Sequence, residues 1–291
     1  MSKERFVEMV AGIARERTDE MEGKLLLDGF ASYFIEEKFE DGEPVAGDLE
    51  LHIVMPAQEN EREKWRTFLM DEGLPILHET EKEAVEWIRE WIKSLHPFEI
   101  APGIWVNPFP DREIEAPKNA IVLRIVPSFA FGTGHHATTT LAARLVAKYV
   151  KPKDRVLDLG CGTAILSVIA LKLGAVSALA SDNDPLSVRR AGETAEENAV
   201  VLKTLESDLL SGVNEAERFD LVVANIVTDI LAKLAVDPKL AKVIPPGGRL
   251  ILSGIHAGGA ERLEKLFSKK DFEILEKINQ ENWEGWALRR H

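Results

Sequence analysis

An alternation of strand and helix patterns between residues 98 and 291 constrains the fold of this chain most strongly. The strand-like runs include "RVLDLG" (155–160), "ALASDND" (178–184), "FDLVVANI" (219–226) and "GRLILSGI" (248–255). Helical patterns separate them, including "ILSVIALKLG" (165–174), "PLSVRRAGETAEENA" (185–199), "ILAKLAVDPKLAKVI" (230–244) and "GAERLEKLFSKK" (259–270). Two earlier strand patterns, "GIWVNPF" and "AIVLRIVP", and a late pair in "FEILEKINQENWEGWALRR" complete the set. This order predicts an α/β fold, with a mostly parallel sheet that carries helices on both faces.

The first 97 residues follow a different pattern. We expect a helix over residues 4–22, because Phe6, Met9, Val10 and Ile13 share one helical face. "ASYFIEEKF" and "GDLELHIVMP" predict paired strands joined by "EDGEPVAGD", and "NEREKWRTFLMDEG" predicts a second helix. These elements form an α+β domain over residues 1–78. A helix over 79–97, ended by Pro97, is expected to link it to a catalytic domain at 98–291.

Charge and composition exclude several classes of function. The net charge of −13, from 49 acidic and 36 basic residues, argues against a broad phosphate-binding surface, so we expect no direct contact with nucleic acid. The longest apolar run contains Lys172 and Gly174, and it predicts a helix followed by a strand instead of a membrane span. The only cysteine is Cys161, which excludes an internal disulfide and a cysteine-based zinc site. With a polar, charged start and no signal peptide, the chain is expected in a reducing cytoplasm.

The stretch "RVLDLGCGTA" predicts a buried strand that ends near Asp158 and turns through Gly160 and Gly162 into a helix. Glycine permits a tight turn and a close approach of a ligand to the backbone. Three nucleotide-binding interpretations compete. A P-loop requires a lysine that is absent, and Ile165 at the sixth position weakens the dinucleotide fingerprint. S-adenosylmethionine sites also use a glycine turn, with an acid just before the glycines, where Asp158 stands.

Two further polar residues follow later strands. Asp182 comes 22 residues after Gly160, where an acid at a strand end hydrogen-bonds ribose hydroxyls. It could instead be a helix cap or turn residue ahead of Pro185. Asn225 ends an apolar strand, where α/β sheets place ligand-binding groups, although a plain strand-end turn is the alternative.

The stretch "FAFGTGHHATTT" contains adjacent histidines, His135 and His136. Adjacent histidines point in different directions, and the seven histidines show no metal-ligand spacing such as H-E-x-x-H. We therefore expect no metal site.

Taken together, "VPSFAFGTGHHATTT", "VLDLGCGTAILSVIALKLGA", "SDNDP", "VVANI", "LSGI" and "ENWEGWAL" resemble the ribosomal protein L11 methyltransferases, the PrmA family, over residues 84–291. The resemblance implies a Rossmann-like class I methyltransferase sheet, with a smaller N-terminal α+β domain for substrate recognition and a linker helix. It implies S-adenosylmethionine as the methyl donor and, as acceptors, lysine side chains and the N-terminal amine of a large-subunit ribosomal protein. It also implies that Thr139, Gly160, Asp182 and Asn225 contact the cofactor. The glycine turn adds Asp158 and Gly162 as further candidate cofactor contacts.

The loop from Phe131 to Thr139 would then close over the methyl donor, with His136 as pocket wall or as catalytic base. No catalytic residue is assigned. The sequence departs from the family at Ala164, which replaces a glycine, at Ala137, which replaces a proline, and at His135, where threonine is usual. No strand is evident before the helix expected at 4–22. Two alternatives therefore stay open: methylation of a different protein or a small-molecule amine, and a non-catalytic binding module. We expect a monomer.

Overall fold

The computed structural model describes residues 5–18, 21, 24–25, 33–40, 43–83, 95–109, 111–126, 132, 134, 136–268 and 271–291. The chain divides into two compact units, residues 1–95 and 96–291.

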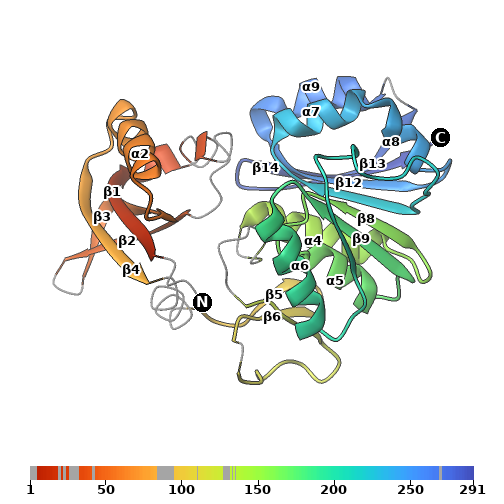
Figure 1. Cartoon of the computed structure of the whole chain (residues 1–291), viewed down its shortest axis with the longest axis horizontal. Helices are drawn as coiled ribbons and strands as arrows, with labels where there is room; N and C mark the ends of the chain where they lie inside the picture. Colours follow the sequence, from red (N-terminus) through yellow and green to blue (C-terminus); the bar gives the residue numbers. More distant parts are fainter. Residues whose placement is uncertain are drawn as a thin grey trace. The chain divides into compact units, whose positions relative to one another are not determined.

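The N-terminal unit contains an antiparallel four-stranded sheet of order β2-β3-β1-β4, coloured red to orange in Figure 1. Helix α2 (Glu59–Asp71) packs on one face through Trp65 and Leu69. A short 3₁₀ turn, η1 (Arg15–Arg17), follows the first strand. The strands are β1 (Arg5–Ala14), β2 (Tyr33–Glu40), β3 (Glu43–Pro56) and β4 (Ile76–Glu83).

The helix expected over residues 4–22 is wrong, because residues 5–14 form the central strand β1. Val7, Met9, Ala11 and Ile13 alternate onto the α2 face, and Val10 on the opposite face is also fully buried. A strand buried on both faces reads as a nearly continuous apolar run, which also matches a helical spacing. β1 is the N-terminal strand that is not evident from the sequence pattern. β3 begins at Glu43, so most of the expected "EDGEPVAGD" connection is strand.

The helix expected over 79–97 is also wrong at its start, because residues 79–83 belong to the edge strand β4, paired with β1. Glu79 and Glu81 pair with Arg66 and Arg62 of α2. Charged residues are common on edge strands, and they imitate a helical composition. Residues 84–94 lie outside the described part of the chain.

The C-terminal unit is built on a seven-stranded sheet of order β10-β9-β8-β11-β12-β14-β13. The first five strands are parallel, and β14 and β13 pair antiparallel at one edge. The expected α/β fold is confirmed. The strands are β8 (Arg155–Leu159), β9 (Ser177–Asp182), β10 (Lys203–Glu206), β11 (Leu221–Asn225), β12 (Arg249–His256), β13 (Phe272–Gln280) and β14 (Trp283–Arg290).

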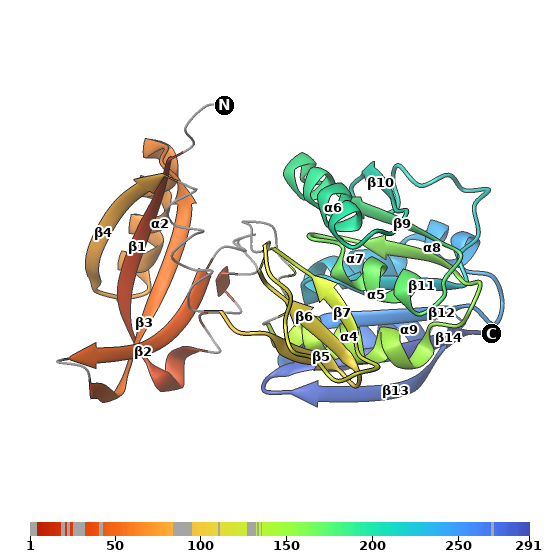
Figure 2. The same cartoon turned by 90° about the horizontal axis from the view of Figure 1, so that it is seen from below.

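Helices cover both faces of this sheet, as Figures 1 and 2 show. One face packs on α4 (Ala137–Tyr149), α5 (Ile165–Lys172) and α6 (Pro185–Glu197). The other packs on α7 (Thr228–Val236), α8 (Pro238–Val243) and α9 (Ala257–Ser268). A small sheet of β5 (Phe98–Ala101), β6 (Ile104–Asn107) and β7 (Ile121–Arg124) joins the α4–α5 core. No described helix is long and apolar enough to cross a bilayer.

Three elements of this unit differ from expectation. The single helix expected at 230–244 is two helices, because Asp237 caps a new helix that starts at Pro238. The short strand β10 and the helix α4 were not predicted. Thr139, expected in a loop, lies in the first turn of α4.

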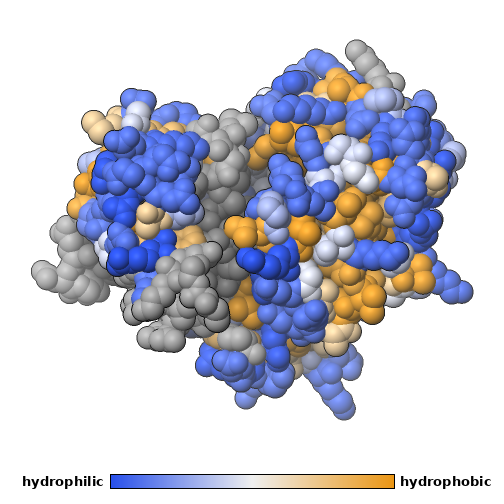
Figure 3. Space-filling view, viewed as in Figure 1, coloured by the Kyte–Doolittle hydropathy of each residue, from blue (hydrophilic) through white to orange (hydrophobic). Residues whose placement is uncertain are grey.

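Exposed large apolar side chains are scattered over this unit. Figure 3 shows one face of the molecule, on which hydrophobic residues in orange lie among hydrophilic residues in blue. The exposed apolar side chains belong to different elements and turns, which is ordinary for a protein surface. They are Val176, Leu186, Val201, Val236 and Leu275.

Candidate functional site

The candidate site residues meet at the carboxyl ends of β9, β8 and β11, which are neighbours in the sheet. From β8 the chain continues outward to β9 and β10, and it then returns to β11 and β12 on the other side. The boundary between β8 and β11 is therefore the topological switch point, where open α/β sheets bind their ligands.

After β8 ends at Leu159, the chain turns through Gly160 and Gly162 into α5. Both glycines have positive φ, +66° and +51°. A Cβ on Gly160 would lie 2.4 Å from Cγ2 of Ile226, so this position requires glycine sterically as well as conformationally. Ala164, one of the three departures from the family pattern, has a left-handed φ of 60° as the N-cap of α5. Alanine there keeps the turn at a conformational cost of about 1 kcal/mol.

Asp158 is buried under this turn, 1% exposed. Its Oδ2 accepts hydrogen bonds from the Ser167 hydroxyl (2.8 Å) and backbone N–H (3.2 Å) of α5. Its Oδ1 is buried and has no hydrogen-bond partner among the described residues. Burial raises the pKa of Asp158 to about 7; the bonds from Ser167 partly oppose this effect, and the charge of Asp182 adds to it. The carboxyl group therefore holds an acceptor atom ready for a cationic ligand.

Asp182 at the end of β9 fastens the glycine turn. Its Oδ2 accepts the Gly162 N–H at 2.9 Å, and its Oδ1 accepts the Asp184 N–H at 3.0 Å. The cap of α6 is Asp184, which accepts from Leu186 and Ser187, so Asp182 is not the cap of this helix. The bond from the Asp184 N–H agrees with the other half of that alternative, a turn residue ahead of Pro185. Asp182 is half-buried, which leaves its carboxylate within reach of a ligand in the turn.

Asn225 and Thr139 form the opposite side. The Asn225 amide Nδ2 lies 3.5 Å from Thr139 Oγ1, and Asn225 Oδ1 is buried without a hydrogen-bond partner among the described residues. Thr139 is fully buried. The Ser253 hydroxyl donates to the Thr138 carbonyl at 2.8 Å, which ties the start of α4 to β12.

His136 is the N-cap of α4, and its Nδ1 accepts the Thr138 N–H at 3.2 Å. Burial lowers the pKa of His136 to about 4, so the ring is neutral at physiological pH. Its ring lies edge-on to Trp283, with centroids 5.5 Å apart. A nitrogen of such low basicity is a poor acceptor for an ammonium proton, so the low pKa of His136 favours its interpretation as pocket wall over that as base. The described residues contain no group of three or more His, Cys, Asp or Glu that could hold a metal ion.

The structure therefore brings all six predicted residues, Thr139, Asp158, Gly160, Gly162, Asp182 and Asn225, to one edge of one sheet. Sequence reasoning missed Ser167, which bonds Asp158, Ser253, which bonds the Thr138 carbonyl, and Trp283, which packs against His136. Ser167 is the third residue of α5 and lies on the helix face that contacts Asp158. The helical periodicity of this segment is the only sequence signal that could have indicated the contact.

Comparison with known proteins gives a consistent family. The family model described as "Ribosomal protein L11 methyltransferase (PrmA)" matches residues 20–291. A ribosomal protein L11 methyltransferase of Thermosipho melanesiensis is 33% identical over 287 residues, 99% of each chain. That of Thermotoga neapolitana is 35% identical over 286 residues, covering 98% of this chain and 99% of the relative.

A solved structure agrees with the sequence relatives. The ribosomal protein L11 methylase from Lactobacillus delbrueckii subsp. bulgaricus superimposes with a TM-score of 0.61 and 32% identity, covering 68% of this chain and 100% of that one. The chain thus belongs to the PrmA family of ribosomal protein L11 methyltransferases.

Proposed function

We propose that this protein transfers methyl groups from S-adenosylmethionine to amines of ribosomal protein L11, at lysine side chains or at the N-terminal amine. The observation that carries the proposal is a pair of buried oxygens, Asp158 Oδ1 and Asn225 Oδ1, on either side of the switch point, neither of which has a hydrogen-bond partner within the described part of the chain. A buried polar atom without a partner is costly unless a ligand satisfies it. Because the chain belongs to a methyltransferase family, the methyl donor is the ligand that we propose to lie between these two oxygens.

The donor set fits the chemistry of S-adenosylmethionine. Asp158 would accept from its α-ammonium group, and Asp182 would accept from ribose hydroxyls. The turn at Gly160 and Gly162 would let the ligand approach the backbone, and Thr139 with Asn225 would wall the reacting end. No pyrophosphate group is expected, since neither a P-loop lysine nor the sixth-position glycine or alanine of the dinucleotide pattern is present.

S-adenosylmethionine would supply a methyl group bound to a sulfonium sulfur: as the nitrogen–carbon bond to the attacking amine forms, the carbon–sulfur bond breaks and the sulfur leaves as a neutral thioether. The nitrogen lone pair forms the new bond, so a lysine with an ordinary pKa near ~10.4 must first lose a proton to solvent. The residues of this chain would contribute by alignment and by exclusion of water, and positioning is worth up to about 7–11 kcal/mol. A neutral Asn225 and a neutral His136 suit an amine that must stay uncharged.

The alternative acceptors, another protein or a small-molecule amine, were suggested by the lack of an evident first strand in the N-terminal unit. Because β1 is that strand, this reason for the alternative no longer applies. We retain the recognition of the protein substrate by that unit as a proposal. We propose that the reaction takes place in the cytoplasm, where ribosomal proteins are made. That the protein is a monomer stays a prediction.

The test is methyl transfer from labelled S-adenosylmethionine to purified L11, followed by mass spectrometry of its peptides. We expect methylated amines with the wild-type chain and at least a tenfold lower rate with Asn225→Ala, because Asn225 walls the reacting end. Label on other proteins or free amines, with none on L11, would reject the acceptor. No transfer to any amine would reject the activity.

A further inference from the structure

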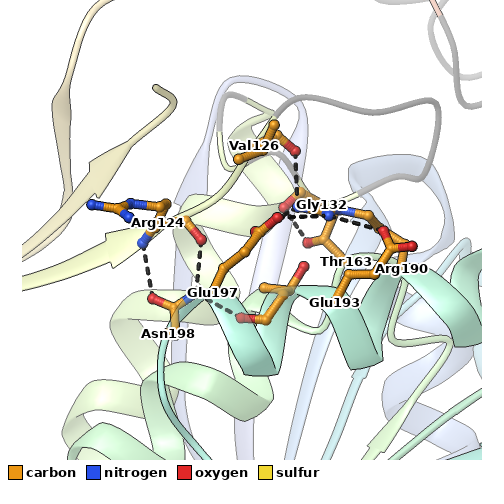
Figure 4. A network of polar contacts seen from close by, with 9 residues as sticks. Arg124, Val126, Gly132, Thr163, Arg190, Glu193, Glu197 and Asn198 are labelled. Carbon is orange, nitrogen blue, oxygen red and sulfur yellow. Dashed lines mark hydrogen bonds and ion pairs between the residues drawn. The ribbon is translucent and has the colours of Figure 1, made fainter. Parts of the chain in front are cut away.

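The strongest unexplained contact beside the site is made by Thr163, which follows Gly162 in the turn. Its side chain is fully buried, and its Oγ1 donates a hydrogen bond of 2.7 Å to the backbone carbonyl of Gly132 (Figure 4). Gly132 has a φ of +99°, and a Cβ there would lie 2.8 Å from Thr163 Oγ1. The close approach therefore depends on a residue without a side chain.

The chain before Gly132 is fastened to α6. The Asn198 side chain accepts from the Arg124 N–H at 2.8 Å and donates to the Arg124 carbonyl at 2.7 Å (Figure 4). Arg190 donates to the Val126 carbonyl at 3.3 Å and is itself held by Glu197 at 2.7 Å. The end of β7 is thus fixed independently of Thr163.

The Thr163 bond joins the two segments that carry the proposed donor contacts. Thr163 lies between Gly162 and Ala164 in the glycine turn, and Gly132 lies seven residues before Thr139. Gly134 packs mainly on the small sheet, since a Cβ there would lie 3.0 Å from Cζ of Phe98 and 3.2 Å from Cδ1 of Ile100, and only in ordinary contact, 3.5 Å, with Cδ1 of Ile165 in α5. The bond therefore fixes the distance between Thr163 in the turn and the backbone of Gly132.

We propose that Thr163 is a positioning residue for the methyl donor: its hydroxyl holds the backbone of Gly132, seven residues before Thr139, at the distance from the glycine turn that the donor requires. The inference rests on the proposed use of S-adenosylmethionine. Thr163 contacts neither donor nor acceptor in this scheme; it acts through the backbone of Gly132. Loss of the hydroxyl leaves the Gly132 carbonyl without this partner and lets the two sides of the site separate.

Three variants isolate this role. Thr163→Val keeps the side-chain shape and removes the hydroxyl, whereas Thr163→Ser restores it. Thr194→Val is the matched control, since Thr194 is also fully buried but its Oγ1 has no hydrogen-bond partner among the described residues. Binding of S-adenosylhomocysteine is measured by calorimetry, and KM for the donor and kcat are measured with L11.

We expect Thr163→Val to weaken binding and to raise KM for the donor about five- to tenfold, with kcat at saturating donor within about twofold of wild type. Thr163→Ser and Thr194→Val should both stay within about twofold. A merely structural role would lower the folded fraction, which reduces apparent kcat and leaves KM unchanged. Unchanged donor binding in Thr163→Val, or no recovery in Thr163→Ser, overturns the inference.

If Thr163→Val does not fold, Gly132→Ala is the second probe, because its Cβ displaces the same hydroxyl. Unchanged donor affinity in a folded Gly132→Ala variant likewise overturns the inference. A wild-type chain that binds no S-adenosylhomocysteine overturns the proposed function itself, which separates the two failures.

Discussion

Replacing Asp158 with asparagine should stabilise the free protein and weaken the binding of the methyl donor. Asp158 is buried, and its Oδ1 has no described partner, so its ionised form is unfavourable in the folded chain. Asparagine keeps an oxygen that can accept both bonds from Ser167, but it carries no charge. Residues that are needed for binding often lower the stability of the free protein, so replacing such a residue stabilises the fold and weakens the binding.

The magnitude follows from the raised pKa of Asp158, about 7 against an ordinary 3.8. Between these two pH values the folded chain keeps a proton that the unfolded chain has lost, so stability falls as pH rises through this window. Above pH 7 the full penalty applies, about 4 kcal/mol at about 1.4 kcal/mol for each pKa unit. The asparagine amide stays unpaired, so we expect a gain of about 2–4 kcal/mol at pH 8, and little or none near pH 4.

Urea unfolding of the full chain at several pH values between 4 and 8 measures the effect, and calorimetry with S-adenosylhomocysteine measures the loss of affinity. Asp154→Asn is the matched control, because Asp154 is buried in an ion pair with Arg249 at 2.8 Å. That change should destabilise by about 3–5 kcal/mol at pH 8, since it leaves a buried cation with a weakened partner. An Asp158→Asn variant less stable than wild type at pH 8 would refute the reasoning.

Three further predictions concern the supports of the site, and urea unfolding measures each of them. His136→Ala should lower the free energy of unfolding by about 1 kcal/mol, whereas His136→Asn should keep the cap of α4; equal losses would contradict capping. Gly160→Ala places a Cβ 2.4 Å from Ile226 Cγ2 and should cost about 2–4 kcal/mol; adding Ile226→Ala should recover part of it, and no recovery would exclude the clash. Asn198→Ala removes both side-chain partners of the Arg124 backbone and should cost about 2–3 kcal/mol; an unchanged midpoint would show that water replaces them.

The sheet of the C-terminal unit and the place of the site could be predicted because the relevant signals are local. Asp158, Asp182 and Asn225 each end an apolar strand, and parallel strands bring their carboxyl ends to one edge. The supports could not be predicted, because long-range packing creates them. The bond from Ser253 to the Thr138 carbonyl joins residues 115 positions apart, and no local pattern indicates it.

The N-terminal unit misled sequence reasoning where two periodicities coincide. Residues 5–14 are apolar at helical and at strand spacings, and only the pairing of β1 between β3 and β4 decides for the strand. Residues 79–83 are mostly charged and helix-prone, but they lie in β4, where the side chains of Glu79 and Glu81 pair with Arg66 and Arg62 of α2. In both cases tertiary contacts override local preference.

Calorimetric titration of the full chain with S-adenosylhomocysteine at pH 7, in two buffers of different ionisation enthalpy, tests the central claim most directly. The account predicts one saturable site, with release of about half a proton as the α-ammonium group lowers the pKa of Asp158 from about 7. It also predicts that the proton release disappears in Asp158→Asn, and that Asn225→Ala weakens binding. No saturable binding, or binding that neither substitution alters, would contradict the account.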